Sequence, residues 1–238
     1  MNGKSGLRTE MEHRLANIQT QRLRSRIYQH HVPLLVACSI IVAVLYTTRP
    51  YKDVLTRLSF STAYPALALL ALTLLIGPWN LLRRKKNPVS GDLRRDVGIW
   101  AGVLGLIHVA VGQNVHLRGR PWLYYVYEHQ AHGPSGLRHD LFGFNNYTGL
   151  FGSLVLIALL ATSNDWSLRR LGTPQWKQLQ RLNYLCFALS AAHAIGYQVM
   201  ENQKATFEVA AVSCIAIAFL FQIVGFGLRR RRSLHATV

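Results

Sequence analysis

Six long apolar runs dominate this chain of 238 residues, and polar segments rich in Lys and Arg separate them. Each run is close to the roughly 20 residues that an α-helix needs to cross the hydrocarbon of a bilayer. Backbone N–H and C=O groups in lipid must be paired within their own segment, so helices are expected. The sequence therefore predicts an all-α membrane protein, a bundle of six transmembrane helices at about 31–48, 58–80, 97–117, 145–163, 180–200 and 206–228.

The charge of the chain is strongly basic, with 27 Lys and Arg against 10 Asp and Glu. In a soluble protein such an excess favours nucleic-acid binding. Here the basic clusters alternate with the apolar runs, as they do in multispanning membrane proteins, and no DNA- or RNA-recognition motif is present. We therefore expect the lipid bilayer as a partner and no nucleic acid.

The basic residues also predict the orientation. Twenty of them fall on the N-terminal tail, the second and fourth loops and the C-terminal tail, and seven fall on the other three loops. Cytoplasmic loops carry the excess of Lys and Arg, so both termini are expected in the cytoplasm. The predicted organisation is a basic cytoplasmic N-terminal tail (1–30), a six-helix transmembrane domain (31–228) and a basic cytoplasmic C-terminal tail (229–238).

Two histidines, His108 and His193, lie at similar depth in two of the predicted spans, roughly 16–20 Å from the cytoplasmic edge at about 1.5 Å per residue. An ionisable side chain within the membrane is costly and is a functional hypothesis by default. One metal centre between the two helices, a heme with two axial histidines, is one interpretation that the residues alone leave open. The alternative is that each histidine is hydrogen-bonded to a neighbouring helix and has a structural or proton-relay role.

Small residues accompany the pair. Gly105 and Gly112 share a helix face with His108. They are candidates for a surface against which a bulky cofactor lies, although small residues also serve close helix packing in membranes. Near the external mouth, His116 and Arg118 are candidates for binding a heme propionate, with interfacial anchoring as the alternative.

Two segments resemble a known family. They are GIWAGVLGLIHVAVG in the third span and NNYTGLFGSLVLIALLATSNDWSLRRLGTPQWKQLQRLNYLCFALSAAHAIGY over 145–197. The end of the fourth span, the RR-LG turn and the W-K-x-L-x-R-L-x-Y start of the fifth span carry the likeness. This region, about 97–200, resembles the ferric reductase-like transmembrane domain superfamily. Within it the chain is most similar to the MsrQ, or YedZ, type of heme-binding membrane subunit.

The resemblance implies that His108 and His193 are the axial ligands of a heme b. The family usually has a further histidine in the W-K-x-L-H-R-L element, and this chain has Gln180 there. Glutamine is a poor heme ligand, so one heme b per chain is expected rather than two. The sequence has no C-x-x-C-H element for covalent heme attachment.

The resemblance further implies an electron-transfer subunit of an oxidoreductase in the bacterial inner (plasma) membrane. Its donor would be a quinol or a cytoplasmic flavoprotein, and its external acceptor a periplasmic reductase or a metal ion. A quinone is a second candidate cofactor. The sequence has no G-x-G-x-x-G element and no soluble stretch long enough for a flavin or nicotinamide domain. A non-redox transporter or assembly factor is the alternative from another class.

Overall fold

The computed structural model describes residues 3–48, 51–83, 92–117, 119–128, 136–201 and 205–235. This part of the chain is helical, with one isolated antiparallel bridge between Val126 and Leu137. The elements in chain order are α1 (Gly3–Arg26), the π-helical segment η1 (Ile27–His31), α2 (Val32–Thr48), α3 (Val54–Leu82), α4 (Asp92–Gly112), the 3₁₀ turn η2 (Pro121–Tyr124), α5 (Leu141–Ala161), α6 (Asp165–Gln180), α7 (Leu182–Met200) and α8 (Ala205–His235).

Each predicted span corresponds to one helix, and the predicted all-α class is confirmed for the described residues. Five helical stretches there are long and apolar enough to cross a membrane: Asn17–Thr48, Val54–Leu82, Asp92–Gly112, Leu141–Ala161 and Ala205–Arg230. Helix α7 is not among them, because Asn183, His193 and Gln198 lower its hydropathy. The crossing of α7, and with it the count of six spans, remains a prediction.

The predicted third span, 97–117, was placed five residues too late. Helix α4 begins at Asp92 and ends at Gly112. It ends there because the next residues, Gln113 and Asn114, form a polar turn. The early start reflects Asp92 and Asp96, whose charges have partners on another helix (described below). His116 therefore lies in the turn beyond α4 rather than on the helix.

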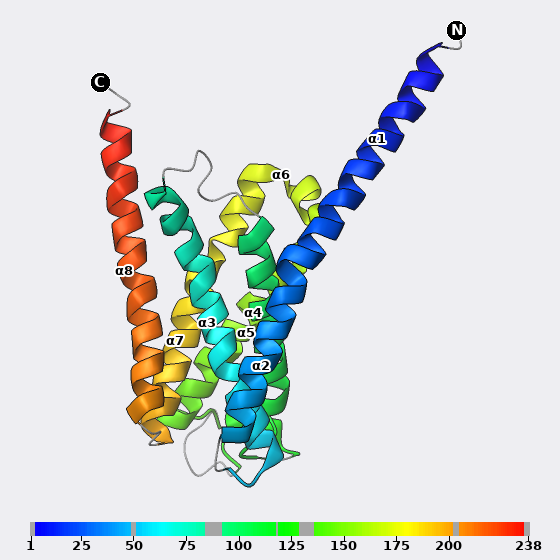
Figure 1. Ribbon diagram of the computed structural model, residues 1–238. Helices are drawn as coiled ribbons and strands as arrows, with labels where there is room; N and C mark the ends of the chain where they lie inside the picture. The colour runs from blue at the N-terminus through cyan, green and yellow to red at the C-terminus, as the bar shows by residue number, and fades with distance from the viewer. Residues whose placement is uncertain are drawn as a thin grey trace.

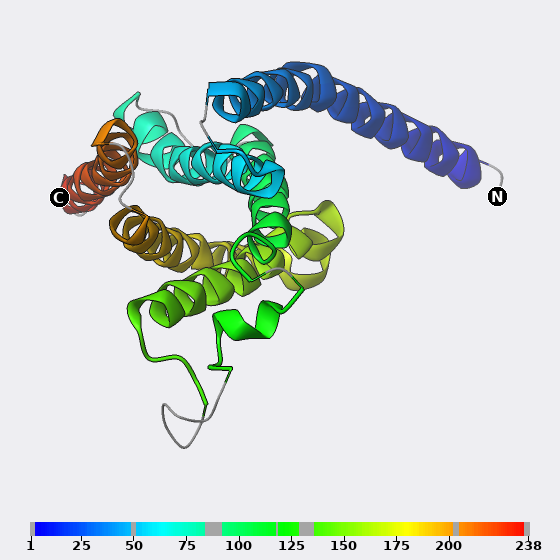
Figure 2. The ribbon, with the colours of Figure 1, turned by 90° about the horizontal axis from the view of Figure 1, so that it is seen from below.

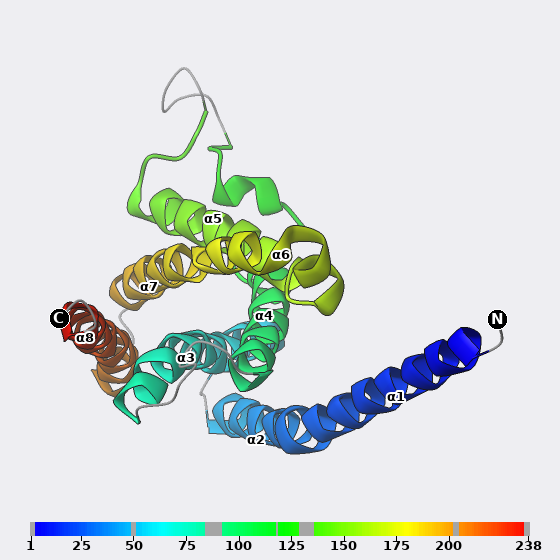
Figure 3. The same cartoon turned by 90° about the horizontal axis from the view of Figure 1, so that it is seen from above.

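The helices form a ring. Seen along the bundle axis, α3 packs against α4, α4 against α5, α5 against α7, and α8 closes the ring between α7 and α3 (Figures 2 and 3). Helix α2 packs on the outside of α3, and α1 continues away from the bundle (Figure 1). The start of α1 and the end of α8 lie at the same end of the molecule, as an even number of membrane crossings requires (Figure 1). Which side of the membrane this end faces remains a prediction.

A compact apolar core lies where α3, α5, α7 and α8 meet. Its buried residues include Leu70 and Leu74 of α3, Leu159 of α5, Phe187 of α7 and Ile215 of α8. Because a bilayer solvates apolar surface, close packing rather than water exclusion holds such an interior together. This core closes the ring at one end and leaves a hollow between the helices at the other.

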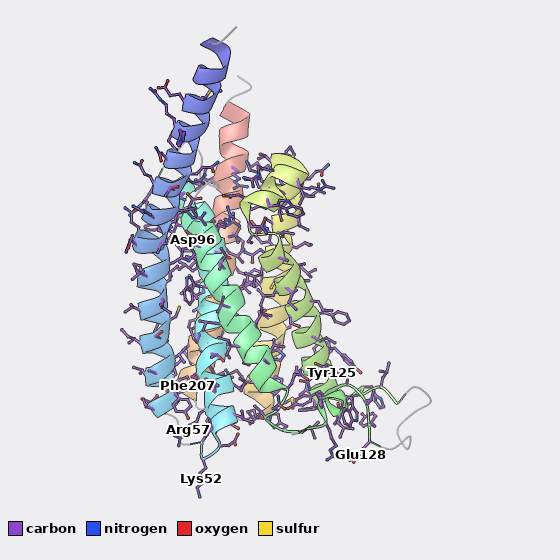
Figure 4. All side chains as sticks on the ribbon, turned by 90° about the vertical axis from the view of Figure 1, so that its right-hand side faces the viewer. Lys52, Arg57, Asp96, Tyr125, Glu128 and Phe207 are labelled. Atoms are coloured by element: carbon purple, nitrogen blue, oxygen red, sulfur yellow. The ribbon has the colours of Figure 1, made fainter. Side chains whose placement is uncertain are left out.

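A buried carboxylate fixes the N-terminal segment to the ring. Asp96 on α4 is fully buried, and it lies at the end of the bundle opposite Tyr125, where the N-terminal helix passes α4 (Figure 4). Arg26 forms an ion pair with it, and His30 Nδ1 lies 2.7 Å from Asp96 Oδ2. One turn away, Arg22 forms an ion pair with Asp92 at 2.7 Å.

His31 completes this network. Its Nε2 lies 3.3 Å from Asp96 Oδ1, and its Nδ1 accepts a hydrogen bond from Trp100 Nε1 at 3.2 Å. The π-helical turn η1 brings His30 and His31 together toward one carboxylate, a crowding that the regular α-helical spacing does not give to adjacent residues. The predicted boundary of the N-terminal tail at residue 30 remains untested, but residues 22–31 contact the ring.

Helix α6 changes direction at one glycine. Gly172 has φ 72° and separates two helical pieces, in the RR-LG element that the sequence marked as a turn. Residues other than glycine rarely adopt this φ. The second piece is tied back to α5 by Trp176, whose Nε1 donates to the carbonyl of Thr162 at 2.8 Å.

Asp140 caps helix α5, and we expect it to stabilise the fold in a way that is lost in acid. Its side chain accepts the N–H of Gly143 at 2.8 Å, and the Arg138 guanidinium, with this N–H, holds the pKa of Asp140 below its usual range. We expect Asp140→Ala to lower the free energy of unfolding by about 1 kcal/mol at neutral pH. Because the pKa is lower in the folded state, the stabilisation is present above about pH 4 and is lost as the pH falls through the folded-state value.

Thermal unfolding in detergent across pH measures both effects. Asp140→Asn is the matched control, since asparagine caps helices equally well but does not titrate. It should keep most of the stability at neutral pH and lose the dependence on acid. An Asp140→Ala protein as stable as the wild type at neutral pH contradicts the assignment of Asp140 as the cap.

Candidate heme site between His108 and His193

A cavity of about 520 Å³ opens inside the ring, within the size range of small-molecule and cofactor sites. Helices α3, α4, α5 and α7 supply its walls, α8 contributes Ala211, and the α4–α5 loop contributes Tyr124 and Tyr125. Its deep part is lined by Leu67, Leu70 and Leu156 together with Ser153 and Ser190, and polar side chains also line the part next to the α4–α5 loop.

His108 of α4 and His193 of α7 face each other across this cavity. Their ring centroids are 6.2 Å apart, and the ring planes are inclined by 73°. The two helices pass on different sides of the ring, so this juxtaposition depends on the fold and not on neighbouring sequence.

Both imidazoles are oriented through the same nitrogen. His108 Nδ1 lies 3.0 Å from the carbonyl oxygen of Ser59 on α3, and His193 Nδ1 lies 2.7 Å from the carbonyl oxygen of Asn145 on α5. A carbonyl oxygen only accepts, so Nδ1 carries the proton in each neutral ring and Nε2 keeps its lone pair. Metal-binding histidines have this arrangement, with the second nitrogen fixed by a carbonyl or carboxylate.

The spacing of the rings fits a shared metal. A metal–imidazole bond of about 2 Å and a ring about 1 Å from centre to nitrogen put the centroids of two opposed ligand rings about 6 Å apart. Among the described residues, no three His, Cys, Asp or Glu side chains cluster as a metal site. A bare ion would thus have two protein ligands here, whereas a heme iron needs only two axial ligands from the protein.

The two glycines singled out from the sequence, Gly105 and Gly112, both line the cavity. A Cβ at Gly105 would lie 2.6 Å from Leu156 Cδ2, and one at Gly112 would lie 3.6 Å from Ser59 Oγ. Gly105 thus lets α4 approach α5 closely, which is the packing interpretation, and it also borders the cavity. At Gly112 a Cβ would make only an ordinary van der Waals contact.

His116 lies at the mouth of the cavity next to the α4–α5 loop. Its Nε2 is 3.4 Å from a carboxylate oxygen of Glu201, and its ring stacks on Tyr197 with centroids 6.3 Å apart. Tyr197 in turn contacts His193, with centroids 4.8 Å apart. His116 therefore reaches the pair through one tyrosine. Arg118, the other predicted propionate partner, lies outside the described residues.

Gln180 lies away from the cavity, at the end of α6. Its Nε2 donates to Thr162 Oγ1 at 3.3 Å. On α4, Arg95 donates to the carbonyl of Ser163 at 2.8 Å and pairs with Asp165 at 2.5 Å. The polar residues at this end of α4 and α6 thus bind the α5–α6 turn.

Several residues that shape the site were missed from the sequence. Ser59 and Asn145 act through backbone carbonyls, which no side-chain pattern marks. A Cβ at Gly149 would lie 2.7 Å from His193 Nδ1, so α5 approaches the ring only because residue 149 is glycine. Gln198 lines the cavity and donates to Tyr64 OH. The side chains of Asn145 and Gln198 could have been singled out from the sequence, because polar Asn and Gln within apolar runs are costly in a membrane.

Known proteins with a similar sequence are heme-binding subunits by name. The chain is 27% identical over 172 residues, 71% of its length and 77% of theirs, to the "Protein-methionine-sulfoxide reductase heme-binding subunit MsrQ" of Salmonella paratyphi B, Salmonella newport and Salmonella heidelberg. No protein-family model and no solved structure matches the chain. The predicted relationship is confirmed: this protein is a distant relative of the MsrQ-type membrane subunits.

Proposed function

We propose that the protein is a multi-pass membrane electron-transfer subunit that binds one heme b between His108 and His193. One observation carries the proposal: two imidazoles face each other across a cavity, both with Nδ1–H bound to a carbonyl and Nε2 left to ligate. The heme-binding name of the MsrQ relatives supports the cofactor. When bound, heme iron accepts and gives up one electron at a time.

The residues of this chain have distinct roles in that function. His108 and His193 would occupy both axial positions, which leaves none for oxygen or substrate. The carbonyls of Ser59 and Asn145 hold the imidazole orientation and raise the basicity of each ligand. Leu67, Leu70 and Leu156 lower the polarity of the deep wall, and low polarity around a heme is one of the factors that set its potential.

The polar external half of the cavity suits the carboxylate end of a heme. Gln113 Nε2 donates to Tyr125 OH at 2.8 Å, and both residues line the cavity. His116 and Arg118 remain our proposed propionate partners. Arg138 forms an ion pair with Asp140, and Arg120 forms one with Glu128. Arg138 and Arg120 are therefore less suited to bind a propionate.

The proposed electron path runs from a quinol or a cytoplasmic flavoprotein to an external acceptor such as a periplasmic reductase, with a quinone as a second candidate cofactor. The proposed setting is the bacterial inner membrane with both termini in the cytoplasm, which the basic loops support. Labelling of single introduced cysteines at residues 24 and 122, both exposed, measures the orientation. We expect an impermeant reagent added outside to reach residue 122 and not residue 24.

The reduced-minus-oxidised absorption spectrum of the purified full chain tests the cofactor, together with the heme-to-protein ratio. We expect a six-coordinate, low-spin b-type spectrum and about one heme per chain. Two hemes per chain would contradict the role given to Gln180. A colourless protein from heme-replete cells would overturn the proposal and favour a transporter or assembly factor in which the histidines are structural.

A further inference from the structure

Helices α5 and α7 approach each other unusually closely beside His193. Asn145 is fully buried on α5, and its side chain lies beside Gly196 of α7, less than one turn beyond the histidine. A Cβ at Gly196 would lie 1.8 Å from Asn145 Oδ1 and 2.4 Å from its Cγ. No side chain other than hydrogen fits at residue 196 while Asn145 holds this position.

The same contact sets the hydrogen bond of the ligand. The Asn145 carbonyl accepts from His193 Nδ1 at 2.7 Å, and the His193 ring lies over Gly149, one turn further along α5. The Asn145 carboxamide is anchored on α7 as well, since its Nδ2 lies 2.8 Å from Met200 Sδ. Separation of α5 from α7 at Gly196 would therefore lengthen the bond from Nδ1 to the carbonyl.

We infer that Gly196, in contact with Asn145, is a positioning residue that sets the redox potential of the heme and the tilt of the His193 ring. This inference rests on the proposed function. A hydrogen bond from Nδ1–H to a carbonyl raises the basicity of the ligating nitrogen and so favours ferric over ferrous iron. Loss of the bond raises the midpoint potential.

The test compares Gly196→Ala with wild type by spectroelectrochemical titration and by electron paramagnetic resonance of the ferric form. The low-spin signal of a bis-imidazole heme depends on the angle between the two ring planes, which is 73° here. We expect Gly196→Ala to shift the midpoint potential upward and to change this signal, while two axial histidines remain bound. Gly77→Ala is the matched control, because a Cβ there meets nothing within 4 Å.

A second variant separates positioning from misfolding. The three atoms nearest to the new methyl group, Oδ1, Cγ and Nδ2, all belong to the Asn145 carboxamide. Gly196→Ala with Asn145→Ala therefore removes these close contacts and keeps the backbone carbonyl. We expect the double variant to have the midpoint potential and the resonance signal of Asn145→Ala alone. The difference between the effect of Gly196→Ala in the wild type and its effect in the Asn145→Ala background measures the coupling of the two residues. If Gly196→Ala fails to fold, failure of the double variant to regain these values overturns the inference.

The two proposals fail in different ways. A wild-type protein without a low-spin heme overturns the proposed function itself. A wild-type protein with a bis-histidine heme, whose potential and resonance signal are unchanged in Gly196→Ala, overturns only the positioning role of Gly196.

Discussion

Replacement of His108 or His193 by alanine is expected to reduce the heme content from about one per chain to near zero, because each variant leaves the iron with a single protein ligand. Absorption spectra and heme-to-protein ratios of the purified variants measure the effect.

Two controls make this result specific. His139→Ala removes a histidine of the α4–α5 loop that contacts Tyr127 and does not line the cavity. This variant should keep the heme of the wild type. His193→Gly with added imidazole should regain a six-coordinate spectrum, since the free base can occupy the space of the lost ring. Full heme content in His108→Ala or His193→Ala would remove that residue from the ligand set.

Removal of the buried carboxylate at Asp96 should have the largest effect on stability. Asp96→Ala leaves Arg26, which is 9% exposed, with only its longer ion pair to Asp92 at 3.9 Å, and deprives His30 of its acceptor. Loss of one partner of a buried ion pair typically costs about 3–5 kcal/mol. Thermal unfolding in detergent and the yield of monodisperse protein measure the loss.

The comparison that tests this reasoning replaces both charges. Arg26→Met with Asp96→Leu should recover much of the stability, because an apolar pair avoids the unpaired buried charge. Asp165→Asn removes the half-exposed partner of Arg95 and should cost at most about 1 kcal/mol. A stable Asp96→Ala protein would show that the N-terminal helix is held to α4 by apolar packing.

The sequence by itself determined the elements of the fold. Long apolar runs predict helices because a bilayer leaves the backbone no other way to satisfy its N–H and C=O groups, and each predicted span corresponds to a helix. His108 and His193 could also be singled out from the sequence alone, because a histidine within an apolar run is costly. Local composition carries both signals.

Only the tertiary structure decided how those elements meet. That His108 faces His193 depends on the ring of helices, and the bonds that orient the two imidazoles end on backbone carbonyls of Ser59 and Asn145, whose position reflects helix packing and not side-chain type. The partners of Asp96 are separated from it by about seventy residues. The sequence alone therefore gave no reason to begin α4 as early as Asp92, because the ion pairs of its first turns form only in the folded protein. Helix periodicity is local, whereas a site between helices depends on distances that no short stretch of sequence contains.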